Sequence, residues 1–293
     1  MLNNRIAIGA AQFGGFPYGI SSDSSKKVSY AEMSNILIYT KSVGINTIDT
    51  AIAYGESESR LGNFDVSNND VITKLPELPK KCHDISSWVE KNLEGSLLRL
   101  KLPKVYGLLV WNINDLSGPR GRELWAAMQS LKQKKLVHKI GYSIYEPKEL
   151  DIYYDSFFPD IVQTPYNIFD RRLDSSGWLS RLYDSQVEIH IRSIFLQGLL
   201  LMNKTNRPFK FDRWLSLFEK YEYWLRDNNL TAIEASISFA LIDPRITKVI
   251  IGIDSLYQLK EILGNLKIKI KHFPEDLSER DSDLLNPARW SRL

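Results

Sequence analysis

The chain has 293 residues, of which 43% are hydrophobic and 25% charged, and these proportions are typical of a globular protein rather than a disordered or fibrous one. Its 38 basic and 35 acidic residues leave a net charge of +3, so the composition does not favour a nucleic-acid partner. No basic leader precedes an apolar run and no stretch of about 18 apolar residues occurs, so we expect neither secretion nor a membrane span. The single cysteine, Cys82, excludes an intramolecular disulfide and favours a cytoplasmic location.

Short apolar runs alternate along the chain with longer amphipathic stretches, a pattern typical of βαβ units around a parallel sheet. We expect strands over Ile6–Ala10, Ile45–Asp49, Val71–Lys74, Tyr106–Trp111, Lys139–Ser143, Ile161–Thr164, Val187–Ser193 and Lys248–Gly252. Apolar spacing of three and four residues predicts helices that include Ser29–Val43, Ile85–Leu100, Gly121–Lys134 and Thr231–Leu241. An open doubly wound sheet would share this pattern, but eight strands favour a single-domain (β/α)8 barrel over residues 1–293.

Two segments depart from this alternation. Residues 202–228 begin with a polar stretch and continue into an aromatic-rich helix, which predicts a loop and helix insertion after the seventh strand. Because the loops that follow barrel strands build the active face, this insertion is a candidate lid over cofactor or substrate. Residues 273–293 form a C-terminal tail.

Three polar residues lie at or just after the ends of the second and third predicted strands, in a distinctive order. The second strand ends in Asp49, Tyr54 follows five residues later, and the third strand ends in Lys74. This order resembles that of the aldo-keto reductases, which carry a similar stretch of acid, small residues, Tyr and Gly, followed by Ser-Glu and Leu-Gly. Ser57-Glu58 and Leu61-Gly62 match the last two pairs.

The resemblance extends over nearly the whole chain. Further similar segments are Gly9–Gly15, Tyr18-Gly19, Gly141–Ser143, Gln163–Asn167, Phe195–Leu200 and Val249–Gly252. The resemblance implies the same barrel and a nicotinamide-dependent reduction of a carbonyl group.

Carbonyl reduction of this kind needs a hydride for the carbon and a proton for the developing alkoxide. The resemblance assigns the proton to Tyr54. A phenol ordinarily has a pKa of about 10, so donation at neutral pH needs a cation that stabilises the phenolate. Lys74 is the candidate cation, and Asp49 would hold it. Taken singly, such residues are more often a packed aromatic and a structural ion pair.

The fourth strand departs from the family pattern. Relatives place a histidine at its end to bind the substrate carbonyl, whereas this chain has Trp111 there, or Asn112 if the alignment slips by one residue. The four histidines, His83, His138, His190 and His272, all lie elsewhere. Trp and Asn each keep an N–H donor that can orient a carbonyl oxygen. Complete loss of such a donor would lower the rate by roughly 10² to 10³.

The resemblance also implies residues that bind the cofactor. The family's serine-asparagine pair after the fifth strand is reduced to Ser143, which Ile144 follows, and Gln163 on the sixth strand would join Ser143 in holding the nicotinamide carboxamide. At the end of the seventh strand, where relatives often stack an aromatic on the nicotinamide, this chain has Arg192 and Ser193.

The last strand and the helix after it complete the expected cofactor site, with Gly252, Asp254, Ser255, Gln258 and Glu261. Many relatives grip the 2′-phosphate of NADP with a basic residue at the place that Gln258 takes. A neutral glutamine cannot make the charge-assisted contacts of arginine, although the helix start near Ser255 could still bind phosphate. We therefore expect NADP, with NAD as the alternative.

Together these features predict an NAD(P)H-dependent oxidoreductase that acts on a small carbonyl compound. The stacking surface of Trp111, and similarity to relatives associated with bacterial surface-polysaccharide synthesis, favour a sugar or nucleotide-sugar derivative. The alternatives are a cofactor-binding regulatory protein with little catalysis and a non-redox lyase or isomerase. Cys82-His83 lacks metal-ligand spacing, so no metal is expected. The oligomeric state is not predicted.

Overall fold

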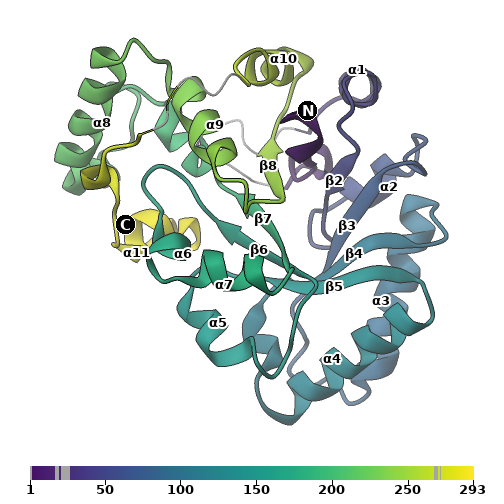
Figure 1. Cartoon of the computed structure of the whole chain (residues 1–293). Coiled ribbons are helices and arrows are strands. Elements are labelled where there is room, and N and C mark those ends of the chain that lie inside the picture. Colours follow the sequence, from purple (N-terminus) through teal and green to yellow (C-terminus); the bar gives the residue numbers. More distant parts are fainter. Residues whose placement is uncertain (1, 17–19, 21–26, 267–269, 271) are drawn as a thin grey trace.

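The computed structural model describes residues 2–16, 20, 27–266, 270 and 272–293. Its strands are β1 Ile6–Gly9, β2 Thr47–Asp49, β3 Asp70–Leu75, β4 Val105–Val110, β5 Val137–Ser143, β6 Ile161–Pro165, β7 Glu188–Arg192 and β8 Lys248–Gly252. Each pairs in parallel with the next, and β8 pairs with β1, so the sheet closes into a barrel (Figure 1). The expected single-domain (β/α)8 barrel is confirmed. Tyr18 and Gly19 of the matched segments lie outside the described residues.

All eight strands lie where the apolar runs predict them, with differences of one or two residues at their ends. Strand β7 stops at Arg192 because Ser193 takes a left-handed backbone with φ of 57°. Strand β4 stops at Val110, and Asn112 caps the 3₁₀ turn that follows, so Trp111 lies just past the strand.

Helices fill the connections between strands and surround the sheet (Figure 1). They are α1 Tyr30–Ser42, α2 Ser57–Leu61, α3 Ile85–Leu100, α4 Gly118–Gln133, α5 Lys148–Tyr153, α6 Arg172–Ser175, α7 Trp178–Asp184, α8 Leu215–Asp227, α9 Ala232–Ile242, α10 Leu256–Gly264 and α11 Ser282–Leu285. Short 3₁₀ turns are η1 Leu2–Arg5, η2 Gln12–Gly14, η3 Ile113–Leu116, η4 Leu196–Leu201, η5 Phe209–Trp214, η6 Glu275–Leu277 and η7 Pro287–Arg292.

Side-chain caps explain where several of these helices begin. The Ser29 hydroxyl accepts from the backbone of Glu32 at the start of α1, and Asp84 caps α3 in the same way. Thr231 and Glu234 form a reciprocal capping box at α9. None of the helices in the described part of the chain is long and apolar enough to cross a membrane.

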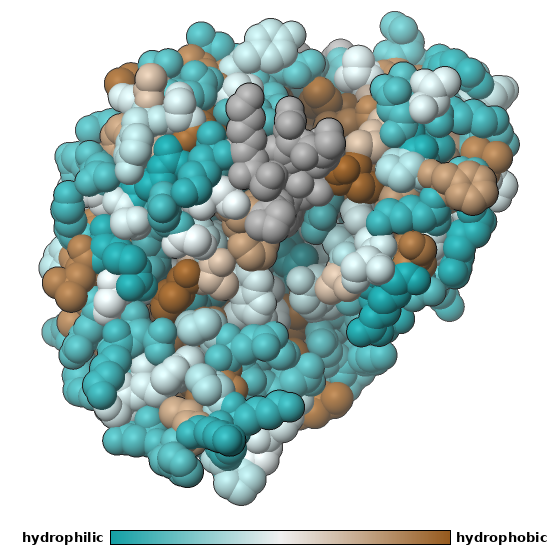
Figure 2. All heavy atoms as spheres, turned by 180° about the vertical axis from the view of Figure 1, so that it is seen from behind, coloured by the Kyte–Doolittle hydropathy of each residue, from teal (hydrophilic) through white to brown (hydrophobic). Residues whose placement is uncertain are grey.

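The apolar side chains gather in the core between the sheet and its helices, which includes Ile8, Ile48, Val71 and Leu108. The face turned away from the view of Figure 1 is mostly hydrophilic, and its hydrophobic side chains lie in small groups (Figure 2). Because the strands are parallel, their carboxyl ends meet at one mouth of the barrel, where the predicted site residues of different strands come together.

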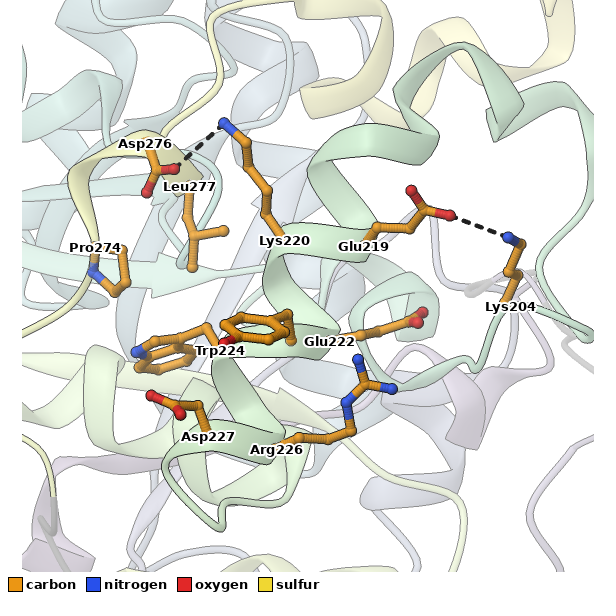
Figure 3. Close-up of a pocket in the computed structure, with 11 residues that line it drawn as sticks. Lys204, Glu219, Lys220, Glu222, Trp224, Arg226, Asp227, Pro274, Asp276 and Leu277 are labelled. Carbon is orange, nitrogen blue, oxygen red and sulfur yellow. Dashed lines mark hydrogen bonds and ion pairs between the residues drawn. The ribbon is translucent and has the colours of Figure 1, made fainter.

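The predicted insertion, residues 202–228, contains η5 and α8. Its side chains contact the C-terminal tail, residues 273–293. The Lys210 ammonium donates to the carbonyl of Trp290, and Arg213 pairs with Asp281. A pocket of about 720 Å³ lies between α8 and residues 274–277, where Lys220 pairs with Asp276 (Figure 3). None of the predicted site residues lines this pocket.

Candidate active site

A buried ion pair lies at the mouth of the barrel, between the ends of β2 and β3. The Lys74 ammonium donates to both oxygens of the Asp49 carboxylate, at 2.8 and 2.7 Å, and to the carbonyl of Thr50 at 2.8 Å. Only 1% of Lys74 and 3% of Asp49 is exposed to solvent. Burial lowers the pKa of the Lys74 ammonium, and the Asp49 carboxylate opposes that effect.

Tyr54 lies beside this ion pair. The Lys74 nitrogen is 5.3 Å from the centre of the Tyr54 ring, within the range of a cation–π contact. The ring is 8% exposed and packs with Ala11 and Ala51. The structure therefore brings together the three residues that the sequence predicts to act together.

The loop that carries Tyr54 depends on close backbone packing. A Cβ atom added to Gly14 would lie 1.7 Å from the Tyr54 carbonyl oxygen, so only glycine fits there without a shift. Gly55, directly after Tyr54, has a φ of +58°, a conformation that side chains rarely adopt. The hydroxyl of Ser57 donates to the Ala10 carbonyl at 2.8 Å and ties the loop to the end of β1.

Trp111 packs against Tyr54, whereas the Asn112 side chain bonds to the turn that follows it. The Tyr54 and Trp111 ring centres lie 5.4 Å apart in an edge-to-face arrangement, and Phe16 contacts both rings. The Asn112 side chain instead accepts from the backbone of Asn114 at 3.2 Å. Of the two residues that the sequence leaves open, Trp111 is the one beside the tyrosine.

A pocket of about 450 Å³ opens next to Trp111. Its lining includes Tyr145 from the loop after β5 and Arg289 from the C-terminal tail. Charged groups of both signs surround it, among them Glu77 and Lys148. An aromatic ring beside hydrogen-bonding groups is a surface that a polyhydroxylated molecule can occupy.

Gln163 has a partner that the sequence does not indicate. Its amide nitrogen donates to Asp49 across the barrel at 2.7 Å, and the residue is 1% exposed. Ser143 lies opposite Gln163 in the neighbouring strand β5. The two side chains are therefore close enough in the sheet for the prediction that both bind the nicotinamide carboxamide. Asp49 is thus held by both Lys74 and Gln163.

Arg192 and Ser193 lie at the end of β7. The Arg192 guanidinium donates to the Ile144 carbonyl at 2.9 Å and lies 4.4 Å from the centre of the Tyr145 ring. Ser193 is 6% exposed, and its hydroxyl has no hydrogen-bond partner among the described residues. A buried hydroxyl of this kind is suited to a polar group of a ligand, because an unpaired buried polar atom costs free energy.

The start of α10 holds the remaining predicted cofactor residues. The Ser255 hydroxyl accepts from the Gln258 backbone at 3.3 Å, and the Gln258 side chain accepts from the Asp254 backbone at 3.1 Å. Gly252 packs on Gln12, whose side-chain oxygen is also buried without a partner in the described structure. Glu261 lies exposed on the second turn of α10.

Three residues that the sequence did not predict lie beside the expected cofactor residues. They are Gln12 next to Gly252, Tyr145 next to Arg192, and Glu32 next to Leu256 at the start of α10. Tyr145 follows Ile144 in a segment already assigned to the site, so its position was a usable signal. Glu32 lies on α1 and accepts a hydrogen bond from the Leu256 backbone at the start of α10. No local pattern links residues this far apart in sequence.

Two of the histidines, His190 and His138, lie within strands rather than at their carboxyl ends. His190 is fully buried, lies 3.0 Å from a Glu188 oxygen and is two residues from the end of β7. His138 packs on the Tyr106 ring near the start of β5. Both positions agree with packed structural roles.

The aldo/keto reductase family model matches residues 5–277, which is most of the chain. This chain belongs to the aldo/keto reductase family. Among curated proteins, this aldo/keto reductase is 24% identical to the uncharacterized oxidoreductase YqkF of Bacillus subtilis over 241 residues, covering 75% of this chain and 77% of the relative. The family and this relative support a carbonyl-reducing oxidoreductase.

Solved structures of similar fold agree with this family membership. A glycerol dehydrogenase from Gluconobacter oxydans is 22% identical with a TM-score of 0.68, and covers 89% of this chain and 86% of its own. An aldo-keto reductase from Bacillus halodurans is 18% identical with a TM-score of 0.69, and covers 93% of this chain and 89% of its own. At these identities the likeness shows the barrel fold of this aldo/keto reductase.

Proposed function

We propose that this aldo/keto reductase reduces the carbonyl group of a small molecule with a nicotinamide cofactor, and that Tyr54 donates the proton. The observation that carries the proposal is the buried contact of the Lys74 ammonium with Asp49 on one side and the Tyr54 ring on the other. A positive charge beside a phenol stabilises the phenolate that remains when the proton leaves. When bound, the nicotinamide supplies the hydride.

The other residues would bind and orient. Asp49, itself held by Gln163, fixes the Lys74 ammonium, so that its charge stays beside Tyr54. Ser143 and the Ser193 hydroxyl, which has no partner among the described residues, would bind polar groups of the nicotinamide end, and Arg192 reaches the Ile144 carbonyl next to Ser143. Trp111 takes the place of the family's histidine and would orient the carbonyl oxygen through its indole N–H.

The pocket beside Trp111 supports a sugar or a sugar derivative as the substrate class. Its aromatic rings, Trp111 and Tyr145, can stack on an apolar sugar face, while its charged groups can bind hydroxyls. The single cysteine supports a cytoplasmic location. We propose further that residues 202–228 act as a lid that is anchored to the tail.

Transfer of an isotope label tests this function. The purified protein is incubated with reduced nicotinamide cofactor deuterated at carbon 4 and a panel of aldehydes and keto sugars, and the alcohols are analysed by mass spectrometry. We expect deuterium in at least one product. Cofactor binding without any label transfer would favour the regulatory alternative, and absence of binding by NADH and NADPH alike would overturn the proposal.

A further inference from the structure

A carboxylate from another helix occupies the start of α10. Helices α1 and α10 lie side by side (Figure 1), and the Glu32 carboxylate of α1 accepts a hydrogen bond from the Leu256 backbone, the first residue of α10. The next donors are also engaged: the Gln258 amide donates to Ser255, and the Asp254 amide to the Gln258 side chain. Three backbone donors at this helix start, those of Asp254, Leu256 and Gln258, are therefore bound to side chains, one of them anionic.

Among the described residues, the charged groups around this helix start are unfavourable for a phosphate. Glu32 and Asp254 are both acidic, and the lysine of α10, Lys260, lies over the Tyr39 ring of α1 at 5.3 Å. Gln258, at the place where the family resemblance implies a basic residue, is neutral and cannot make charge-assisted contacts. A free helix start attracts an anion through its N–H groups and its dipole, but Glu32 already supplies that negative charge.

Two buried polar atoms at this side of the barrel mouth are suited to a ligand. Barrel enzymes often bind phosphorylated ligands with the loops after strands seven and eight and the start of a helix. The Ser193 hydroxyl after β7 is buried and unpartnered among the described residues, as is the side-chain oxygen of Gln12 beside Gly252 at the end of β8. These atoms are groups that a bound cofactor could satisfy.

We propose that Glu32 makes this site select NADH over NADPH. This inference rests on the proposed nicotinamide-dependent function and deepens it, and it favours NAD, the alternative that the sequence left open, over the expected NADP. The two cofactors differ by the 2′-phosphate of the adenosine ribose, which carries up to two negative charges that the Glu32 carboxylate repels. The 2′-hydroxyl of NADH is neutral and can donate a hydrogen bond to a carboxylate.

Binding titrations of the full chain test the proposal without relying on turnover. Dissociation constants of NADH and NADPH are measured by cofactor fluorescence for the native protein, for Glu32→Gln, and for Glu123→Gln as a control. Glu123 lies exposed on α4, so its change alters the net charge equally at a place outside the site. We expect the native protein to bind NADH more tightly, and Glu32→Gln to tighten NADPH binding by about tenfold, or about 1.4 kcal/mol.

The outcomes separate the two proposals. Equal binding of both cofactors by the native protein, or NADPH affinity in Glu32→Gln no better than in the control, would overturn the role of Glu32 and leave the proposed function standing. Binding of neither cofactor would overturn both. Should Glu32→Gln fold poorly, the salt dependence of the native protein provides a second test. Salt screens repulsion between charges, so the preference for NADH over NADPH should narrow as the ionic strength rises. A preference that salt leaves unchanged would contradict the proposal.

Discussion

Trp111 lies beside Tyr54 at the mouth of the barrel, and this position gives it a testable role. We expect Trp111→Phe, which keeps the aromatic shape but lacks the indole N–H, to lower the reduction rate by up to about 10² to 10³. Trp111→His keeps a donor and should lose less. Steady-state rates at saturating cofactor measure the effect.

Equal rates for Trp111→Phe and the native protein would contradict a donor role and leave Trp111 as a packing residue. Cofactor dissociation constants serve as the control. A variant that binds the cofactor normally but turns over slowly has lost an interaction with the substrate or the transition state rather than the folded site.

The residues Asp49, Tyr54 and Lys74 could be predicted because Asp49 and Lys74 lie at the ends of strands, Tyr54 follows Asp49 closely, and all three belong to local motifs. The partner of Gln163 could not, since its hydrogen bond to Asp49 joins β6 to β2 across the barrel. Local sequence also left Trp111 and Asn112 as equal candidates. The contact of the Trp111 ring with Tyr54 and the cap that Asn112 forms on the next turn distinguish them.

At the scale of elements, the packing of η2 against the Tyr54 loop predicts the effect of a single methyl group. A Cβ atom at position 14 would overlap the Tyr54 carbonyl oxygen, so Gly14→Ala must displace one of the two segments. We expect a loss of stability of about 1 to 3 kcal/mol. The reduction rate should fall with it, because Tyr54 moves. Urea unfolding and steady-state kinetics measure the two effects.

Gly264→Ala is the matched control for this substitution. A Cβ atom there meets no atom of the described residues within 4 Å, so we expect stability and rate to stay close to those of the native protein. If Gly14→Ala behaves like this control, the close approach of η2 to the Tyr54 loop does not matter for the site.

The elements themselves were largely predictable, because buried parallel strands produce continuous apolar runs and capped helices begin at recognisable residues. The predicted bounds of α3, Ile85–Leu100, agree with the structure, since Asp84 caps its start. The ends of β4 and β7 differ by one residue. They depend on backbone turns at Asn112 and Ser193 that hydrophobic periodicity does not encode.

At the scale of the whole molecule, a polar cluster inside the barrel links stability to pH. Glu188 of β7 accepts hydrogen bonds from Tyr106 and Lys139 and pairs with His190. Burial raises the pKa of Glu188, but the hydrogen bonds from these three residues outweigh it and bring the pKa to about 2, below the ordinary 4.5. The ionised carboxylate therefore stabilises the folded barrel above about pH 4.5, and this contribution is lost as the pH falls toward 2.

Glu188→Gln tests this linkage. The variant should lose stability near neutral pH, and its urea midpoint should fall less than that of the native protein between pH 4.5 and 2. Glu123→Gln, an exposed change on α4, should follow the native curve. If Glu188→Gln shows the full acid-dependent loss, another carboxylate controls this pH window.

The number of strands predicted the closed barrel, but it did not predict the contact between helices α1 and α10 that closure of the barrel produces. Because β8 pairs with β1, α10 is brought against α1 and Glu32 reaches the start of a helix more than two hundred residues later in the chain. No linear motif signals that contact. The family resemblance predicted a nicotinamide cofactor. The contact of Glu32 with the start of α10 is the basis of the proposed preference for NADH over NADPH.

The most direct test of the central claim is a single-turnover measurement of reduced-cofactor oxidation by Tyr54→Phe, with Tyr183→Phe on the surface of α7 as the matched control. Positioned proton donors contribute about 10² to 10⁴ in rate. We predict that Tyr54→Phe binds the cofactor as the native protein does but oxidises it at least about 10² times more slowly, while Tyr183→Phe is unaffected. Oxidation at the native rate by Tyr54→Phe would contradict the account.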